Sequence, residues 1–288
     1  MKYIDLHVHS NASDGTLSPT ELVKAAMKNN LSAFALTDHD TIKGIDEAIS
    51  AASDLSKNGQ SIRVIPGTEL SVTYMGRDIH ILGLFIDYKD PEFCKLLDDA
   101  ALERENRNHK MIDNLASAGI DITMEKLRAS EGDAILTRAH FAKYLKEQGV
   151  VTSMQEAFQK YLSKGTPYYV ARNYISAESA ISRIKMAGGI PVLAHPLLYK
   201  LSNTELDRLI SYLKECGLVG IEAIYHANTG FDESYIKKFA NKYELLVTGG
   251  SDFHGANKPQ LDIGIGRGNL KIPYSILEKL ERYLLETI

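Results

Sequence analysis

The chain has 288 residues, of which 44% are hydrophobic and 24% are charged, and its formal net charge is −4. This composition is typical of a soluble globular protein with a sizeable core, and the negative charge argues against a general polyanion-binding surface. The chain has two cysteines, no apolar leader and no apolar run near the ~18 residues that a spanning helix needs. We therefore expect a cytoplasmic protein without a disulfide framework.

Short apolar runs alternate with helical patterns along the chain, which is typical of repeated β-α units in a barrel. Ser18 and Glu21 form a capping box around Pro19 and mark the start of the first helix. The two strand-like runs around Met75 and Gly76 predict a hairpin instead of a crossover. The expected strands cover residues 3–8, 32–37, 63–67, 80–85, 190–195, 220–225 and 245–250.

The β-α rhythm stops from about Cys94 to Thr166, where the sequence is polar and helical in pattern. We interpret this segment as a helical insertion between two parts of one barrel. We expect Arg104 and Arg107, near its beginning, to be exposed on a polar helix. The predicted division is a first barrel part, a cap over the substrate and a second barrel part, at residues 1–93, 94–171 and 172–288.

Seven of the nine histidines lie within or just after a predicted strand: His7, His9, His39, His80, His195, His226 and His254. The loops at the C-terminal ends of barrel strands converge on one face, so these imidazoles should meet there. Carboxylates such as Glu69 and Asp252 occur in the same places. Neutral imidazole and carboxylate together suit Zn²⁺, Mn²⁺ or Fe²⁺. A hydroxide between adjacent ions can attack a phosphate ester while the ions neutralise its oxygens.

Other carboxylates leave alternatives open. Asp14 precedes Gly15, and Asp-Gly is also an ordinary turn signal. Asp40 is predicted to cap the helix that follows it. Asp38 and Asp5 are expected to orient histidines from behind.

Five ordered motifs, "DLHVHS…DGT", "TDHDT", "GTE", "AHP" and "SDFHG", resemble those of the PHP (polymerase and histidinol phosphatase) family. The match spans Asp5 to Gly255. "TRAHFAKYL", "YVARNY" and "GIEAIYHANT" are similar to segments of the branch that acts on nucleoside 3′,5′-bisphosphates and on the 5′ ends of short RNA. The resemblance implies an α/β fold, a distorted (β/α)₇ barrel with a helical insertion and a trinuclear metal centre at its mouth.

The resemblance also implies three ligand groups for divalent ions, in which Glu69 bridges the first two ions and Asp14 stands where some relatives have histidine. The first group is His7, His9, Glu69 and Asp252. The second is Glu69, His80 and His195. The third is Asp14, His39 and His254.

Two arginines are candidates for binding a substrate phosphate. Arg138 and His140 open a helix, where the helix N-terminus and a guanidinium would suit an anion. Arg172 follows an aromatic run in which Tyr168 or Tyr169 could stack on a base. The resemblance also implies that these positions contact substrate.

The resemblance puts Glu222 and His226 at the rim of the substrate site, although both could equally be packing residues at a strand end. His226 is a candidate to protonate the leaving oxygen. The residues expected to take part in catalysis are Asp14, His39, Glu69 and His226.

The predicted function is hydrolysis of a phosphate ester by a metal-bridging hydroxide. The expected substrate is the 3′-phosphate of a nucleoside 3′,5′-bisphosphate, with short 5′-phosphorylated RNA as a further one. We expect no membrane and no long duplex nucleic acid as partners. The alternatives are a histidinol phosphate phosphatase, an amidohydrolase and a catalytically inactive PHP module that serves as a binding partner.

Overall fold

The computed structural model describes residues 2–56, 61–129, 132, 134–171 and 175–287. Its centre is a mixed nine-stranded sheet in the order β8-β7-β6-β4-β3-β2-β1-β9, with β5 paired to β3. The strands are β1 (Tyr3–Val8), β2 (Leu31–Leu36), β3 (Arg63–Tyr74), β4 (Arg77–Leu84), β5 (Ile175–Ser176), β6 (Ile190–Leu193), β7 (Gly220–Tyr225), β8 (Leu246–Gly250) and β9 (Ile272–Pro273).

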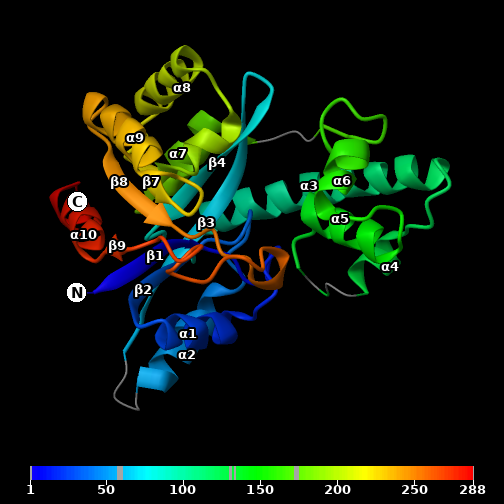
Figure 1. The fold of residues 1–288 in the computed structure, drawn as a ribbon. Helices are drawn as coiled ribbons and strands as arrows, with labels where there is room; N and C mark the ends of the chain where they lie inside the picture. The colour runs from blue at the N-terminus through cyan, green and yellow to red at the C-terminus, as the bar shows by residue number, and fades with distance from the viewer. Residues whose placement is uncertain (1, 57–60, 130–131, 133, 172–174, 288) are drawn as a thin grey trace.

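The sheet curls until β1 lies beside the end of β8, which nearly closes a barrel (Figure 1). The His9 N–H donates to the Phe253 carbonyl oxygen at 3.0 Å, and the Asp252 N–H donates to the His7 carbonyl oxygen at 2.9 Å. The predicted α/β barrel is therefore confirmed, and a strand forms at each of the seven predicted positions.

Helices cover the outside of the barrel and build the insertion (Figure 1). The α-helices are α1 (Pro19–Lys28), α2 (Ile45–Ser56), α3 (Pro91–Ser117), α4 (Met124–Arg128), α5 (Arg138–Glu147), α6 (Met154–Ala157), α7 (Ala177–Met186), α8 (Asn203–Glu215), α9 (Gly230–Lys242) and α10 (Ser275–Thr287). Short 3₁₀ or π turns are η1 (Phe158–Leu162), η2 (Pro196–Tyr199) and η3 (Gly255–Asn257). None of the helices in the described ranges is long and apolar enough to cross a membrane.

Two local sequence signals act as predicted. The Ser18 hydroxyl accepts from the Glu21 N–H at 3.2 Å, and the Glu21 carboxylate accepts from the Ser18 N–H at 2.8 Å, so both halves of the capping box form. Met75 and Gly76 have φ values of 48° and 72°. Positive φ at both central residues is the geometry of a tight hairpin turn, and it joins β3 to β4 in antiparallel register.

The long helix α3 connects the barrel to the insertion. Its first turns bury Phe93 and Leu97 in the barrel core, whereas Met111 and Leu115 near its other end belong to a separate hydrophobic cluster of the insertion. At 1.5 Å per residue, its 27 residues span about 40 Å. The insertion helices lie to one side of the barrel mouth (Figure 1). The predicted boundary at residue 94 falls inside α3.

Candidate metal centre

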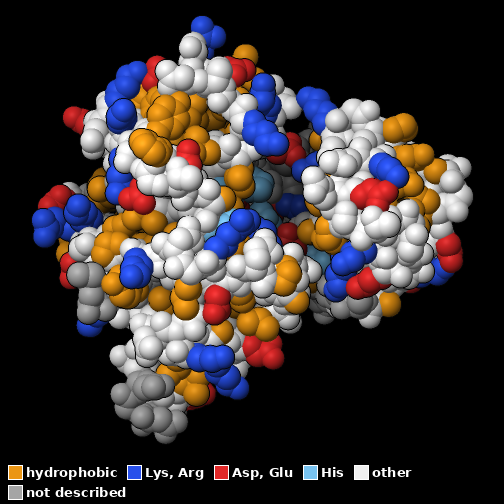
Figure 2. Space-filling view, viewed as in Figure 1, with side chains coloured by type: hydrophobic (Ala, Val, Ile, Leu, Met, Phe, Trp, Pro, Cys, Tyr) orange, Lys and Arg blue, Asp and Glu red, His pale blue; other side chains and the backbone are white. Residues whose placement is uncertain are grey.

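The structure brings all nine predicted metal ligands together at the mouth of the barrel. They come from the ends of strands β1, β2, β6 and β8, from the β3–β4 hairpin and from the loop after β1. In the space-filling view, histidine side chains line the hollow between the barrel and the insertion (Figure 2). The nine residues are His7, His9, Asp14, His39, Glu69, His80, His195, Asp252 and His254.

The Glu69 carboxylate lies at the centre of this cluster. Its Oε1 atom is 2.7 Å from His80 Nδ1 and 2.9 Å from His195 Nε2. Its Oε2 atom is within 3.3 Å of ring nitrogens of three further histidines, His7, His9 and His39. The hairpin register explains part of this arrangement, because Ser71 pairs with His80 and Glu69 lies two residues from Ser71 on the same face.

A second group of ligands surrounds Asp14. Its Oδ1 atom is 3.2 Å from His254 Nε2 and 3.8 Å from His9 Nδ1. Its Oδ2 atom is 3.8 Å from His39 Nε2 and accepts a hydrogen bond from the Thr137 hydroxyl at 3.1 Å. Asp14 lies in a turn, as its Asp-Gly signal indicates, and also faces the histidines.

The ligand atoms fall into three overlapping groups, each within 4.8 Å, that could hold an ion. They differ from the predicted groups in four residues: His9 and His39 each join two groups, whereas the predicted ligands His195 and Asp252 are in none of them. The groups are His9, Asp14, His39 and His254; His7, His9 and Glu69; and His39, Glu69 and His80.

The hydrogen bonding of His7 fits a cation at this centre. Its Nδ1 lies 3.1 Å from Glu222 Oε1, and in a neutral ring that donates its N–H there, Nε2 would be an acceptor. That Nε2 atom lies 3.3 Å from Glu69 Oε2 and 3.1 Å from His9 Nε2. Acceptors that face one another need a cation or proton between them. In addition, the buried Nδ1 atoms of His9 and His39 have no hydrogen-bond partner among the described residues.

Several of the ligands, but not all, are in the protonation states that metal ions require. Glu222 and Glu69 outweigh burial and raise the pKa of His7 well above its usual range, and Glu69 raises that of His80, so an ion would have to displace protons from these two rings. Burial lowers the pKa of His9, and it lowers the pKa of His39 to about 4, so both rings are neutral at pH 7. Burial alone would raise the pKa of Glu69, but His80 and His39 outweigh it and hold that pKa well below its usual range. His39 and His254 likewise keep the pKa of Asp14 low. Neutral imidazoles and ionised carboxylates bind metal without first losing protons.

Glu222 does not lie at the rim of the site. It is fully buried behind His7, and its Oε2 atom accepts from the His195 N–H at 2.8 Å. Because it contacts one ligand ring and the backbone of another ligand, it is placed to orient ligands instead of contacting substrate.

Of the two aspartates expected to orient histidines, Asp5 accepts from the backbone N–H of His7 at 3.3 Å, and both have further partners. Asp5 accepts from the Ser251 N–H at 2.9 Å and from the Gly264 N–H at 2.7 Å, so it ties β1 to two distant loops. Asp38 accepts from the Ser10 N–H at 2.8 Å and from the Ser13 hydroxyl at 2.5 Å. Asp38 therefore fixes the loop that carries Asp14.

The predictions for Asp40 and for two arginines of α3 are wrong. Asp40 is buried, has a φ of 51° and pairs with Arg104, whereas helix α2 begins only at Ile45. Arg104 and Arg107 are 7% and 4% exposed, because this part of α3 packs between the barrel and the insertion. Arg104 also donates to the Ser71 hydroxyl at 3.2 Å.

The predicted substrate residues have different surroundings. Arg138 lines a small cavity together with Asp14, His39 and His80. Its guanidinium donates to Asp78 at 2.7 Å and lies 5.6 Å from the centre of the Tyr169 ring.

His140 is buried, and its Nδ1 accepts from the Thr137 N–H at 2.9 Å, so the ring caps α5; the hydroxyl of the same Thr137 donates to Asp14. Arg172 lies outside the described residues.

His226 follows β7 and packs against the ring of Tyr225 at 4.3 Å between centres. Burial lowers its pKa to about 4, so the ring is neutral at pH 7 and has no extra proton to give to a leaving group. Of the described residues, those that line the cavity over the metal centre do not include His226.

A cavity of about 370 Å³ lies directly over the metal ligands. It is lined on one side by Met154 and Phe158 of the insertion and on the other by Lys258. The Lys258 ammonium donates to Asp252 Oδ2 at 2.6 Å, and the Tyr225 hydroxyl donates to the same oxygen at 2.8 Å. Lys258 was not among the predicted site residues; the only signal was its position four residues after His254.

Fold and site together define a metal-dependent phosphoesterase with an α/β barrel. The chain belongs to the PHP domain family, whose model matches residues 5–248. This finding confirms the family to which the five motifs pointed.

Two relatives are similar over most of their length. A protein from Haemophilus influenzae named 5′-3′ exoribonuclease is 39% identical over 253 residues, which cover 88% of this chain and 90% of the relative. A 3′,5′-nucleoside bisphosphate phosphatase from Chromobacterium violaceum is 35% identical over 265 residues, or 92% and 91% of the two chains. Both names describe enzymes that act on phosphate esters.

Solved structures agree with this class. One from Chromobacterium violaceum, described as an amidohydrolase with bound sulfate and no metal, has a TM-score of 0.86 at 33% identity and covers 97% of this chain and 96% of that one. One from Bifidobacterium adolescentis, described as a metal-dependent phosphoesterase, has a TM-score of 0.83 at 28% identity over 97% and 95% of the chains.

Proposed function

We propose that this phosphoesterase removes the 3′-phosphate of nucleoside 3′,5′-bisphosphates and also acts on short 5′-phosphorylated RNA. The observation that carries the substrate proposal is the place of Arg138, which borders the same small cavity as Asp14, His39 and His80. A guanidinium beside a metal centre can hold a phosphate that is not being hydrolysed. The relatives named as a bisphosphate phosphatase and an exoribonuclease support the same substrate class.

We propose three divalent ions per chain, Mn²⁺, Zn²⁺ or Fe²⁺, held by the nine ligands. When bound, such ions supply an activated water and neutralise the charge on phosphoryl oxygens. Glu69 would contribute one oxygen to the His80 and His195 side and the other to the His7 and His9 side. The carboxylates of Asp14 and Asp252 would complete the remaining sites.

The other residues position and select the substrate. Lys258 is the one lysine that lines the cavity over the ligands among the described residues, and it adds a positive charge where a phosphate would lie. Phe158 and Met154 provide an apolar wall for a sugar or base. Tyr169, in contact with Arg138, offers an aromatic face for a base near the second phosphate. Binding energy from these remote groups would position the scissile phosphate.

The test is phosphate release with Mn²⁺ from a panel of substrates, together with metal analysis of the purified protein. We expect adenosine 3′,5′-bisphosphate to be hydrolysed with a higher kcat/KM than histidinol phosphate, and about three ions per chain. A preference for histidinol phosphate would overturn the substrate proposal. Release of product from amides or lactones without activity on phosphate esters would favour the amidohydrolase alternative.

A further inference from the structure

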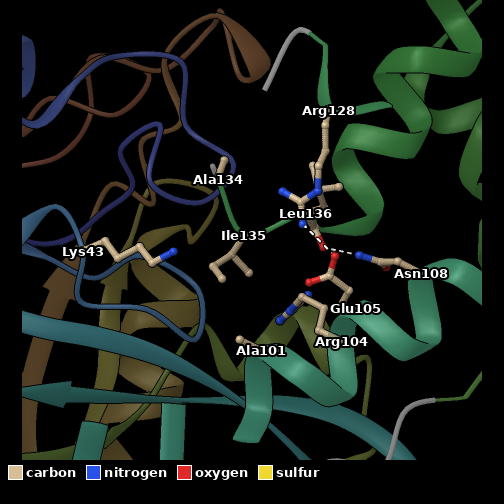
Figure 3. Close-up of a pocket in the computed structure, with 9 residues that line it drawn as sticks. All are labelled: Lys43, Ala101, Arg104, Glu105, Asn108, Arg128, Ala134, Ile135 and Leu136. Atoms are coloured by element: carbon tan, nitrogen blue, oxygen red, sulfur yellow. Dashed lines mark hydrogen bonds and ion pairs between the residues drawn. The ribbon is translucent and has the colours of Figure 1, made fainter. Parts of the chain in front are cut away.

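A second cavity lies beside the metal centre, between α3, the segment that precedes α5 and the loop before α2 (Figure 3). Its volume is about 350 Å³, within the range of sites that bind small molecules. Lys43 reaches towards it from the barrel, while Arg104 and Asn108 face it from α3 (Figure 3). None of these three residues is among those that line the cavity directly over the metal ligands.

The lining of this cavity carries an excess of positive charge. The lining includes three cationic side chains, Lys43, Arg104 and Arg128, and one carboxylate, Glu105; Arg104 is paired with Asp40 outside the lining, so Lys43 carries the excess charge. Arg128 donates to Glu105 at 3.1 Å and is one-third exposed, so its charge is only partly neutralised. The Lys43 side chain is exposed and has no ion-pair partner within the ranges that the structure describes. These charges suit an anionic group such as a phosphate.

Asn108 places a buried hydrogen-bond acceptor in this cavity, which an anion without a donor group cannot satisfy. This residue is 2% exposed, and its Nδ2 donates to the Leu136 carbonyl oxygen at 3.0 Å. That bond fixes which way the amide points, so the other atom is the oxygen. The buried Oδ1 has no hydrogen-bond partner among the described residues. A buried acceptor without a donor is costly, and a ligand hydroxyl or amino group would satisfy it.

Arg104 borders both this cavity and the active site. The same side chain lines the small cavity that contains Asp14, His39 and His80. A chain that leaves the metal centre along this route would meet Arg104 first and the other cations next. Ile135 and Leu136 supply the apolar contact that a sugar or base prefers.

We infer that this second cavity binds the next nucleotide of an RNA substrate whose terminal nucleotide lies at the metal centre. Lys43 and Arg128 hold its phosphate, and Asn108 accepts from its sugar hydroxyl or its base amino group. This inference rests on the proposed function, because it assigns the path of the RNA from the same site. A nucleoside bisphosphate, with its two phosphates at the metal centre and at Arg138 as proposed above, leaves the second cavity unused.

The experiment compares Lys43→Glu with Lys24→Glu, a matched control at an exposed position of α1. The substrates are a 5′-phosphorylated pentaribonucleotide and adenosine 3′,5′-bisphosphate, both with Mn²⁺. We expect Lys43→Glu to raise KM for the pentamer about tenfold and to reduce the slope of log KM against log salt by about 0.7 for one lost phosphate contact. Its KM for the bisphosphate should stay within twofold, and Lys24→Glu should change neither.

Arg128→Ala should reproduce the loss for the pentamer. An unchanged KM for the pentamer in Lys43→Glu, or an equal change for both substrates, would overturn the inference. If the wild-type protein hydrolyses neither substrate, the proposed function fails. The second cavity can still be tested by measuring how tightly the protein binds the pentamer. The affinity for a labelled pentamer, measured by fluorescence anisotropy, must then be weaker for Lys43→Glu than for the wild type and unchanged for Lys24→Glu. Equal affinities for all three proteins would refute the inference.

Discussion

The barrel mouth and the insertion both bring ionisable side chains to the site, but they hold them differently. At the barrel mouth, most of the imidazoles and carboxylates are buried and lie within hydrogen-bond distance of one another, as Glu69 does with His195. In the insertion, Arg138 and Arg128 are partly exposed and paired with single carboxylates. The strands thus fix the groups that perform the chemistry, whereas the insertion presents cations that can exchange partners when a substrate binds.

The largest effect should come from Glu69→Gln. The amide has one acceptor oxygen where the carboxylate has two, so both sides of the metal cluster lose charge and a ligand. We expect kcat to fall by at least about 10³-fold, equivalent to about 4 kcal/mol of transition-state stabilisation. The metal content should fall too, as measured by elemental analysis. Glu233→Gln, at a partly exposed position of α9, is the control, and full metal occupancy with near-normal activity would remove the bridging role of Glu69.

The difference between the two regions also explains what the sequence could predict. Alternating residues on strands such as β1 place His7 and His9 at one barrel end, so short motifs predicted the fold and the side chains that meet at the barrel mouth. The surroundings of an arginine on α3 depend on how a 27-residue helix packs between two cores, which no local pattern reveals. For that reason Arg104 was expected on the surface and is buried against Asp40.

Contacts between residues that are distant in sequence were not predicted, for the same reason. Glu222 has the residue type and strand-end position of a substrate contact, but it lies behind His7 because only β8 separates β7 from β1 where the sheet curls closed. Asp40 precedes a helix, as a cap would, yet its carboxylate accepts from the Ser71 N–H at 2.8 Å. Lys258 follows a motif without belonging to it.

Arg104→Met tests the buried ion pair by which α3 is held between the barrel and the insertion. It removes the guanidinium from Asp40 inside the protein, and losing one partner of a buried ion pair costs about 3–5 kcal/mol. We expect a loss of that size in the free energy of unfolding, measured with urea. The double variant Arg104→Met with Asp40→Asn should be more stable than the single one, since it leaves no buried charge. A loss below about 1 kcal/mol would show that the pair behaves like a surface ion pair.

Arg138→Ala asks whether the insertion selects the substrate. We expect KM for adenosine 3′,5′-bisphosphate to rise roughly 10- to 100-fold, because a charge-assisted hydrogen bond to phosphate contributes about 1.5–3 kcal/mol. KM for a generic aryl phosphate should change less than twofold. Arg77→Ala, at the tip of the same hairpin that carries Asp78, is the control. Equal effects on both substrates would mean that Arg138 supports the fold and does not select the substrate.

The smallest effects should come from a pair of helix caps, one in each region. Ser18 caps α1 on the barrel by accepting from the Glu21 N–H, and Ser153 caps α6 in the insertion by accepting from the Glu156 N–H at 3.1 Å. Replacing either serine by alanine should cost about 1 kcal/mol. Because α3 belongs to both cores, we expect one thermal transition, whose midpoint both variants lower by a similar amount in calorimetry. Two transitions, with Ser153→Ala moving only one of them, would instead mean that the insertion unfolds on its own.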